Sequence, residues 1–130
     1  MAEHGRMNRG LTEAQESYVE FIADAEQDHG HAHVSLLSEA LGVKKPSVVQ
    51  MTARLERKGI VKRRDKEVTL TTMGRRIAGD LQGRHTLLQR FMVERLGMMA
   101  KEANQEACRL EHVVSSGFIN GVRKLTEAER

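Results

Sequence analysis

Two short helical patterns separated by a glycine constrain the fold of this chain more than any other feature. The stretch "VSLLSEALGV" predicts a helix with Ser35 as its N-cap and Gly42 as its stop. The next stretch, "KKPSVVQMTARLERKG", predicts a second helix with Pro46 in its first turn and Gly59 at its end. Two short helices joined by a tight glycine-containing link form a helix-turn-helix arrangement.

A basic hairpin is predicted directly after these helices. In "IVKRRDKEVTLT", Val61 lies in one strand, and Val68 and Leu70 alternate with threonines in the next. The turn falls at Asp65-Lys66, among four basic residues. The sequence therefore predicts a two-stranded wing with a positively charged tip.

Helical patterns flank this region on both sides. We predict a helix from Leu11 to about Gln27, a long helix capped by Thr72, and further helices over "KEANQEACRLEHVVS" and "SGFINGVRKLTEAER". The predicted fold class is mainly α: a winged helix-turn-helix domain with a two-stranded β wing, followed by a helical domain. The predicted boundaries are 1–10 for a flexible N-terminal tail, 11–73 for the winged-helix domain and 74–130 for the helical domain.

Positive charge is concentrated in the middle of the chain. Residues 44–95 hold 14 Lys/Arg against 5 Asp/Glu, although the whole chain has a net charge of only +3. Such a basic region, carried by a winged helix, predicts binding to double-stranded DNA. The residues expected to face DNA are Lys44, Lys45, Pro46, Ser47, Gln50 and Arg54 on the second helix, and Lys62, Arg63, Arg64 and Lys66 on the wing. Because one small module contacts few bases, we expect a homodimer on a palindromic operator.

The single cysteine limits both the compartment and the chemistry. It excludes an intramolecular disulfide, so a reducing cytoplasm is the simplest location, and no apolar run approaches the length of a membrane span. Catalysis by a cysteine–histidine pair is disfavoured because the sequence offers no oxyanion hole and no glycine-rich nucleophile turn. We therefore expect no enzyme and no membrane partner.

The stretch "EACRLEHVVS" places three metal-binding residue types on one helix face. Cys108, Glu111 and His112 stand at i, i+3 and i+4. A metal needs several deprotonated donors that converge on one point, and His85 and Glu20, with Ser17 as a weak addition, could supply more of them. From spacing alone, however, an ordinary polar helix face is the favoured interpretation.

A second histidine-rich stretch, "HGHAH", contains His29, His31 and His33 at alternate positions. Its favoured interpretation is a solvated turn. Weak metal binding is the alternative.

Four segments together resemble one protein family. "ALGVKKPSVVQMTARLERKGIV", "VTLTTMGRRIA", "GRHTLLQRF" and "EACRLEHVVS", in this order and spacing, are similar to the metal-dependent repressors of the diphtheria-toxin-repressor and manganese-transport-regulator family. The resemblance covers roughly residues 11–125. It implies a winged-helix domain, a helical metal-binding and dimerisation domain, and DNA binding that requires Fe(II) or Mn(II). It also implies the short form of the family, without an SH3-like third domain.

The resemblance also implies a set of metal ligands. Cys108, Glu111 and His112 fall on the family's primary-site helix, and His85 falls on its ligand histidine. Glu20 matches a first-helix ligand of manganese-type members, whereas Cys108 is typical of iron-type members. Ser17 stands where those two groups have Asp and Met, so water is expected to take its place.

Two further positions differ from the iron-type pattern. Gln89 and Asn104 stand where iron-type members have the Glu and His of an ancillary site, which implies that this second site is missing or rebuilt. The function predicted is a metal-dependent repressor of iron or manganese homeostasis genes, with a preference for Fe(II) because of the thiolate. The alternative is a metal-independent winged-helix regulator that senses a small ligand or the redox state through Cys108.

Overall fold

A computed structural model gives the fold of the protein and describes residues 10–127. The predicted flexible tail, apart from Gly10, lies outside the described residues. The described residues divide into two compact units. One comprises residues 14–79, and the other comprises residues 80–127 with residues 10–13. We call them the N-terminal unit and the C-terminal unit and describe each separately.

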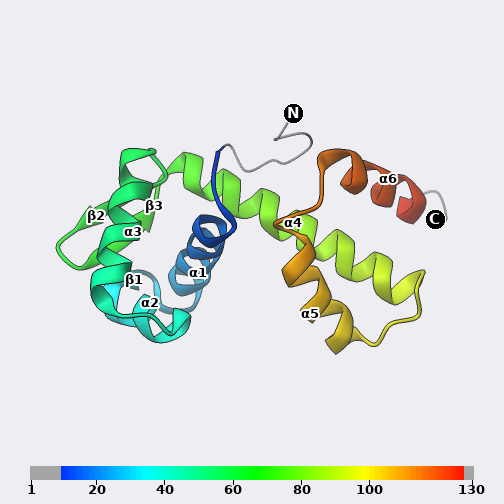
Figure 1. The fold of residues 1–130 in the computed structure, drawn as a ribbon, viewed down its shortest axis with the longest axis horizontal. Coiled ribbons are helices and arrows are strands. Elements are labelled where there is room, and N and C mark those ends of the chain that lie inside the picture. Colours follow the sequence, from blue (N-terminus) through cyan, green and yellow to red (C-terminus); the bar gives the residue numbers. More distant parts are fainter. Residues whose placement is uncertain (1–9, 128–130) are drawn as a thin grey trace. The chain divides into compact units, whose positions relative to one another are not determined.

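The N-terminal unit contains the predicted winged helix-turn-helix (Figure 1). Its elements are α1 (Glu13–His29), β1 (Ala32–His33), α2 (Val34–Leu41), α3 (Lys45–Arg57), β2 (Val61–Arg64), β3 (Glu67–Leu70) and the first turns of α4 (Thr72–Glu94). The mainly helical fold class is therefore confirmed.

Local sequence signals define the link between α2 and α3. Gly42 adopts the left-handed conformation with φ 69°, and its N–H donates to the carbonyls of Ser38 and Glu39. Pro46 lies in the first turn of α3, as predicted. The N-cap of α2 is His33 rather than the predicted Ser35, because the chain before the helix is held in a strand.

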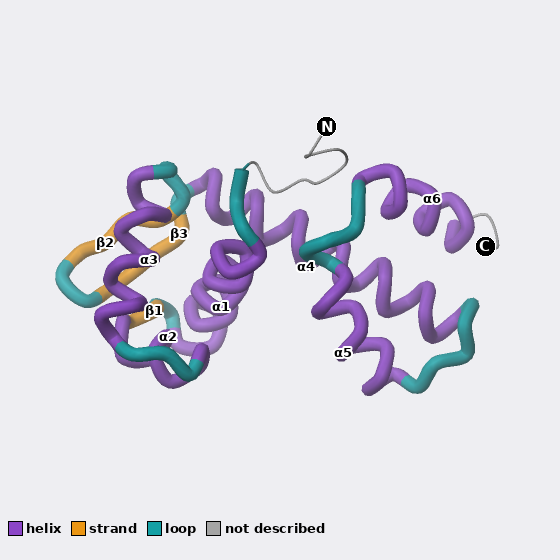
Figure 2. The backbone as a smooth tube through the Cα atoms, viewed as in Figure 1, coloured by secondary structure: helices purple, strands orange, loops and turns teal. Residues whose placement is uncertain are grey.

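The wing belongs to a three-stranded antiparallel sheet with the order β1-β3-β2 (Figure 2). The hairpin of β2 and β3 is confirmed, and its turn contains Asp65 at φ 56°. The third strand, β1, was not predicted. It pairs Ala32 with Val68 and His33 with Glu67.

The threonine after the hairpin joins the wing to α4. Thr71 N–H donates to the Ile60 carbonyl oxygen at 2.9 Å, and Gly74 N–H donates to Thr71 Oγ1 at 3.1 Å. Thr71, and not the predicted Thr72, therefore caps α4. Gly74 packs so closely that a Cβ there would lie 2.2 Å from the Ile60 carbonyl oxygen.

The C-terminal unit is helical. The remainder of α4 packs with α5 (Ala100–Leu110) and α6 (Ser116–Glu127) around a shared apolar core. The buried members of this core are Leu88, Met92, Ala103, Ala107, Val114 and Ile119. The prediction of one helix through residue 115 is wrong, because α5 ends at Leu110 and a turn follows it.

None of the helices formed by the described residues has the length and apolar character needed to cross a membrane.

Candidate metal centre and nucleic-acid interface

Four potential metal ligands lie together in the C-terminal unit. His85 lies on α4 and Cys108 on α5, while Glu111 and His112 occupy the turn that follows α5. The backbone of this turn is still helical in part, because Glu111 N–H donates to the Ala107 carbonyl at 2.9 Å. The predicted i, i+3, i+4 relationship therefore survives the end of the helix.

The carboxylate of Glu111 lies between two imidazoles. Its Oε1 is 2.7 Å from His85 Nδ1, and its Oε2 is 3.4 Å from His112 Nε2. The side chain is only 2% exposed. A buried carboxylate is costly unless hydrogen bonds or opposite charges compensate it, so this environment favours binding of a cation.

The cysteine completes the group from the solvent side. Cys108 is exposed, and its Sγ lies 3.8 Å from His85 Nδ1. One donor atom each from His85, Cys108 and Glu111 lie within 4.8 Å of one another. Bonds of about 2.0–2.3 Å from a transition metal to N, O and S ligands span such spacings after only small side-chain shifts. The donor set therefore fits a transition-metal ion.

Two residues support the ligands in ways that the sequence did not predict. Asn104 Oδ1 lies 2.7 Å from His85 Nε2, one helical turn before Cys108. A metal ion on Nδ1 would leave the imidazole proton on Nε2, where Asn104 can accept it. Its position on the same face of α5 as Cys108 was the signal that could have identified it.

Arg84 is the second supporting residue. It is buried, and its guanidinium donates to the Glu111 and Val114 carbonyls, both at 2.7 Å. These bonds satisfy two carbonyls in the segment that follows α5 and fix the turn that carries Glu111. Its adjacency to His85 in sequence was the only hint of this role.

The remaining predicted ligands lie in the N-terminal unit. Ser17 and Glu20 are half-buried and one turn apart on α1. The pKa of Asp24, on the same helix, is raised by burial and then by the carboxylates of Glu20 and Asp28. This row of carboxylates makes α1 attractive to cations. The participation of Glu20 and Ser17 in a metal site stays a prediction.

Helix α3 presents the residues that were predicted to face DNA. Its buried side consists of Val48, Thr52 and Leu55. The residues of the predicted set are all exposed, on the helix or at its N-cap: Lys44, Lys45, Pro46, Ser47, Gln50 and Arg54. The exposed amide and cations at the start of this helix are suited to base edges and phosphates.

The wing also exposes its predicted cations, Lys62, Arg63, Arg64 and Lys66. Arg63 differs from the others because Glu56 of α3 holds it. Its Nε and its backbone N–H donate to the two carboxylate oxygens at 3.0 and 3.1 Å. Glu56 therefore partly neutralises the charge of Arg63, and this ion pair connects the wing to α3.

Two models of one protein family match the chain. The model described as iron-dependent repressor, N-terminal DNA-binding domain, matches residues 10–67. The model described as iron-dependent repressor, metal-binding and dimerisation domain, matches residues 71–128. Together they include both the α3 surface and the His85–Cys108–Glu111 group.

Individual proteins show the same similarity. The chain is 33% identical to the iron-dependent repressor IdeR of Mycobacterium tuberculosis over 106 residues, which are 81% of this chain and 46% of that protein. It is 31% identical to the diphtheria toxin repressor of Corynebacterium diphtheriae over 108 residues, 82% of this chain and 48% of that protein. The chain thus spans about half the length of these relatives.

A solved structure is similar in fold. It is a manganese-dependent transcriptional repressor in complex with manganese, with a TM-score of 0.75 and 30% identity. The match covers 87% of this chain and 52% of that one.

Proposed function

Because this chain belongs to the iron-dependent repressor family, we propose that it is a transcriptional repressor that binds operator DNA when a divalent cation is bound. The observation that carries the proposal is the buried Glu111 carboxylate between His85 and His112, with the Cys108 thiol beside it. The exposed basic surface of α3 and the wing supplies the DNA-binding half of the function. In the cytoplasm, such a protein would control genes for iron or manganese homeostasis.

The ligands in this proposal are His85, Cys108, Glu111 and His112. We add Glu20, and more weakly Ser17 with a bound water, as predicted ligands from α1. When bound, the cation supplies the positive charge that the Glu111 carboxylate and a deprotonated Cys108 require. Thiolate and imidazole ligands favour Fe(II) over Mn(II), which prefers oxygen, so we propose Fe(II) as the physiological metal.

Control of DNA binding follows from linkage. The cation stabilises the arrangement of the chain in which its ligands lie together over the arrangement in which they do not. It can shift DNA binding only as far as its affinities for these two arrangements differ. By the same thermodynamic cycle, operator DNA must raise the affinity for metal by an equal factor. Glu111 and Arg84 contribute by holding the turn after α5 in one geometry.

A homodimer on a palindromic operator is the proposed DNA-bound form. The C-terminal unit exposes several large apolar side chains: Val93, Leu96, Met99, Val113, Phe118 and Leu125. Apolar surface of this kind is typical of a protein–protein contact. Two copies of α3 would then contact two half-sites about one helical turn of DNA apart.

The test is operator binding under anaerobic conditions, first in EDTA and then with Fe(II), Mn(II) or Zn(II) restored. The probe is a duplex selected from random DNA by the metal-loaded protein. We expect binding only after metal is restored, and we expect Glu111→Gln to need at least about tenfold more metal. The matched control is Glu106→Gln, because Glu106 is a nearby glutamate on α5 that forms an exposed ion pair with Arg109.

Equal operator binding in EDTA and in metal would refute the proposal. It would favour the metal-independent regulator that responds through Cys108.

DNA binding itself has a separate test, since each phosphate contact contributes about 0.9 to the slope of log affinity against log salt concentration. A flat salt response would remove the α3 surface and the wing as the DNA interface.

A further inference from the structure

The histidine-rich connection between α1 and α2 lies outside the centre described above. His29 is the last residue of α1, His31 precedes β1, and His33 is both the end of β1 and the N-cap of α2. The solvated turn favoured from the sequence is therefore incorrect for part of this stretch. Pairing with β3 gives two of its residues a fixed strand geometry.

The register of β1 with β3 determines which side chains face outward. Ala32 and Val68 are partners, and both are buried, at 0% and 1% exposure. Because side chains alternate along a strand, the neighbouring pair, His33 and Glu67, lies on the opposite face. Directly paired residues in antiparallel strands have their Cβ atoms about 4.5–5.5 Å apart, so the imidazole and the carboxylate are neighbours.

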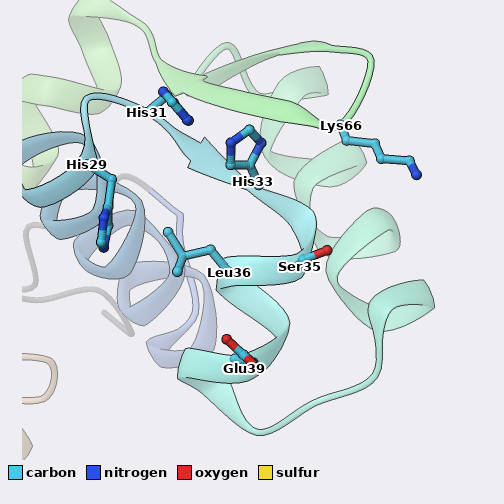
Figure 3. Close-up of a pocket in the computed structure, with 7 residues that line it drawn as sticks. All are labelled: His29, His31, His33, Ser35, Leu36, Glu39 and Lys66. Atoms are coloured by element: carbon cyan, nitrogen blue, oxygen red, sulfur yellow. The ribbon is translucent and has the colours of Figure 1, made fainter.

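His31 lies on the same side as His33. His31 lies in the bend before β1, and its ring centroid is 4.3 Å from that of His33 in an edge-on arrangement, which places the two imidazoles together. Figure 3 shows His33 on β1 and His31 just before it, beside a pocket that His29, Ser35 and Leu36 also line. In the same view, the Lys66 side chain extends away from the imidazoles.

These three side chains form a compact donor group. One ligand atom each from His31, His33 and Glu67 lie within 4.8 Å of one another, and all three residues are half-buried. Two imidazole nitrogens and one carboxylate oxygen are a common set for Zn(II) and other late divalent metals, with water completing the coordination. Partial burial on a paired sheet holds the donors in place better than an exposed loop would.

We propose that His31, His33 and Glu67 bind a second divalent transition-metal ion, for which Zn(II) is the probe. This site belongs to the N-terminal unit alone and does not depend on the function proposed above. Its ligands join β1 to β3 next to the hydrogen bond from Val34 N–H to the Lys66 carbonyl, 3.0 Å long. The metal therefore fastens the wing strand to the start of α2.

The first test is a Zn(II) titration of the whole chain in competition with a chromophoric chelator under reducing conditions. We compare the unmodified protein with His33→Asn, Glu67→Gln and the control His29→Asn. Asparagine is a favoured N-cap residue, so His33→Asn should preserve α2. His29 is a matched control because it is exposed, belongs to the same histidine-rich stretch and is not part of the donor group.

We expect the unmodified protein and His29→Asn to bind one Zn(II) per chain more than His33→Asn does. Glu67→Gln should lower the affinity for that ion by at least about tenfold, because loss of a residue that only supports a metal ligand already has an effect of this size. The proposal is overturned if His33→Asn or Glu67→Gln binds Zn(II) like the unmodified protein. It is also overturned if His29→Asn loses as much Zn(II) binding as His33→Asn does, because that result would indicate diffuse binding by the whole histidine-rich stretch.

A second measurement locates the ion. Zn(II) should slow hydrogen exchange of the Val34 amide in the unmodified protein and in His29→Asn, but not in His33→Asn. The same experiment in a His85→Ala background separates the two sites, because protection at Val34 should persist there. Loss of that protection in the His85→Ala protein would overturn the proposal and would leave the repressor function untouched.

Discussion

Replacement of Gly74 by alanine should weaken the connection between the wing and α4. An added Cβ would lie 2.2 Å from the Ile60 carbonyl oxygen and 3.0 Å from Leu70 Cδ2. Ordinary contacts begin at 3.4 Å, so the two backbones would have to separate by roughly 1 Å. The Ile60 carbonyl cannot move freely, because it accepts from Thr71 N–H at 2.9 Å. The Thr71 hydroxyl, which donates to the neighbouring Gly59 carbonyl at 2.7 Å, also lies 3.0 Å from it.

The magnitude follows from three contributions. Overpacking of this kind costs about 1–3 kcal/mol. Weakening one or two of the hydrogen bonds to the Ile60 carbonyl adds about 0.5–1.5 kcal/mol each. The higher helix propensity of alanine returns at most about 1 kcal/mol. With the midpoint of each range, we expect the free energy of unfolding to fall by about 2–3 kcal/mol, a large share of the total for a small domain.

The assay is urea unfolding followed by helical circular dichroism, since the chain has no tryptophan. The control is Gly79→Ala in the same helix, where nothing lies within 4 Å of the added Cβ. That variant should be stabilised by about 0.5–1 kcal/mol. If Gly74→Ala unfolds at the same urea concentration as Gly79→Ala, the close contact does not limit stability and the reasoning is wrong.

Three further predictions concern the site and its supports. Arg84→Met should lower the free energy of unfolding by about 2–4 kcal/mol in urea titrations, because two buried carbonyls lose a charged donor; an unchanged value would contradict the role given to this guanidinium. Asn104→Ala should weaken metal binding by about 10–100-fold in a competition titration, because the imidazole loses its orienting partner, and unchanged affinity would exclude that role. The backbone N–H and then the guanidinium of Arg63 hold the pKa of Glu56 below its ordinary value. The stability that this carboxylate contributes is therefore present at neutral pH and is lost as the pH falls through the lowered pKa. Unfolding measured from pH 6 to pH 3 should show a steeper acid loss for the unmodified protein than for Glu56→Gln, and parallel curves would count against the contact.

Much of the winged helix could be predicted because its signals are local. Gly42 and Pro46 act through their own backbone preferences, and the alternation at Val68 and Leu70 needs only a two-residue period. The end of α5 could not be predicted in this way. The apolar pattern continues to Val114. The turn is stabilised by Arg84, distant in sequence, whose guanidinium donates to two of its carbonyls.

The metal-binding group was predicted only in part for the same reason. The spacing of Cys108 and Glu111 places them on one face whatever the rest of the chain does. The role of Asn104 depends on the approach of His85 from α4, which no single segment reveals. Likewise, β1 has two residues and too little alternation to be recognised, and it exists because β3 offers it a partner.

The pairing of β1 with β3 constrains how this protein can vary. With only Ala32 buried and His33 outward, insertion or deletion of one residue between Gly30 and Ala32 would turn an imidazole toward the core and a methyl group toward solvent. Substitutions within the stretch would be tolerated much better than changes in its length. Homologous chains should therefore keep the residue count of this connection even where its composition differs, and engineered loops placed here should preserve that count.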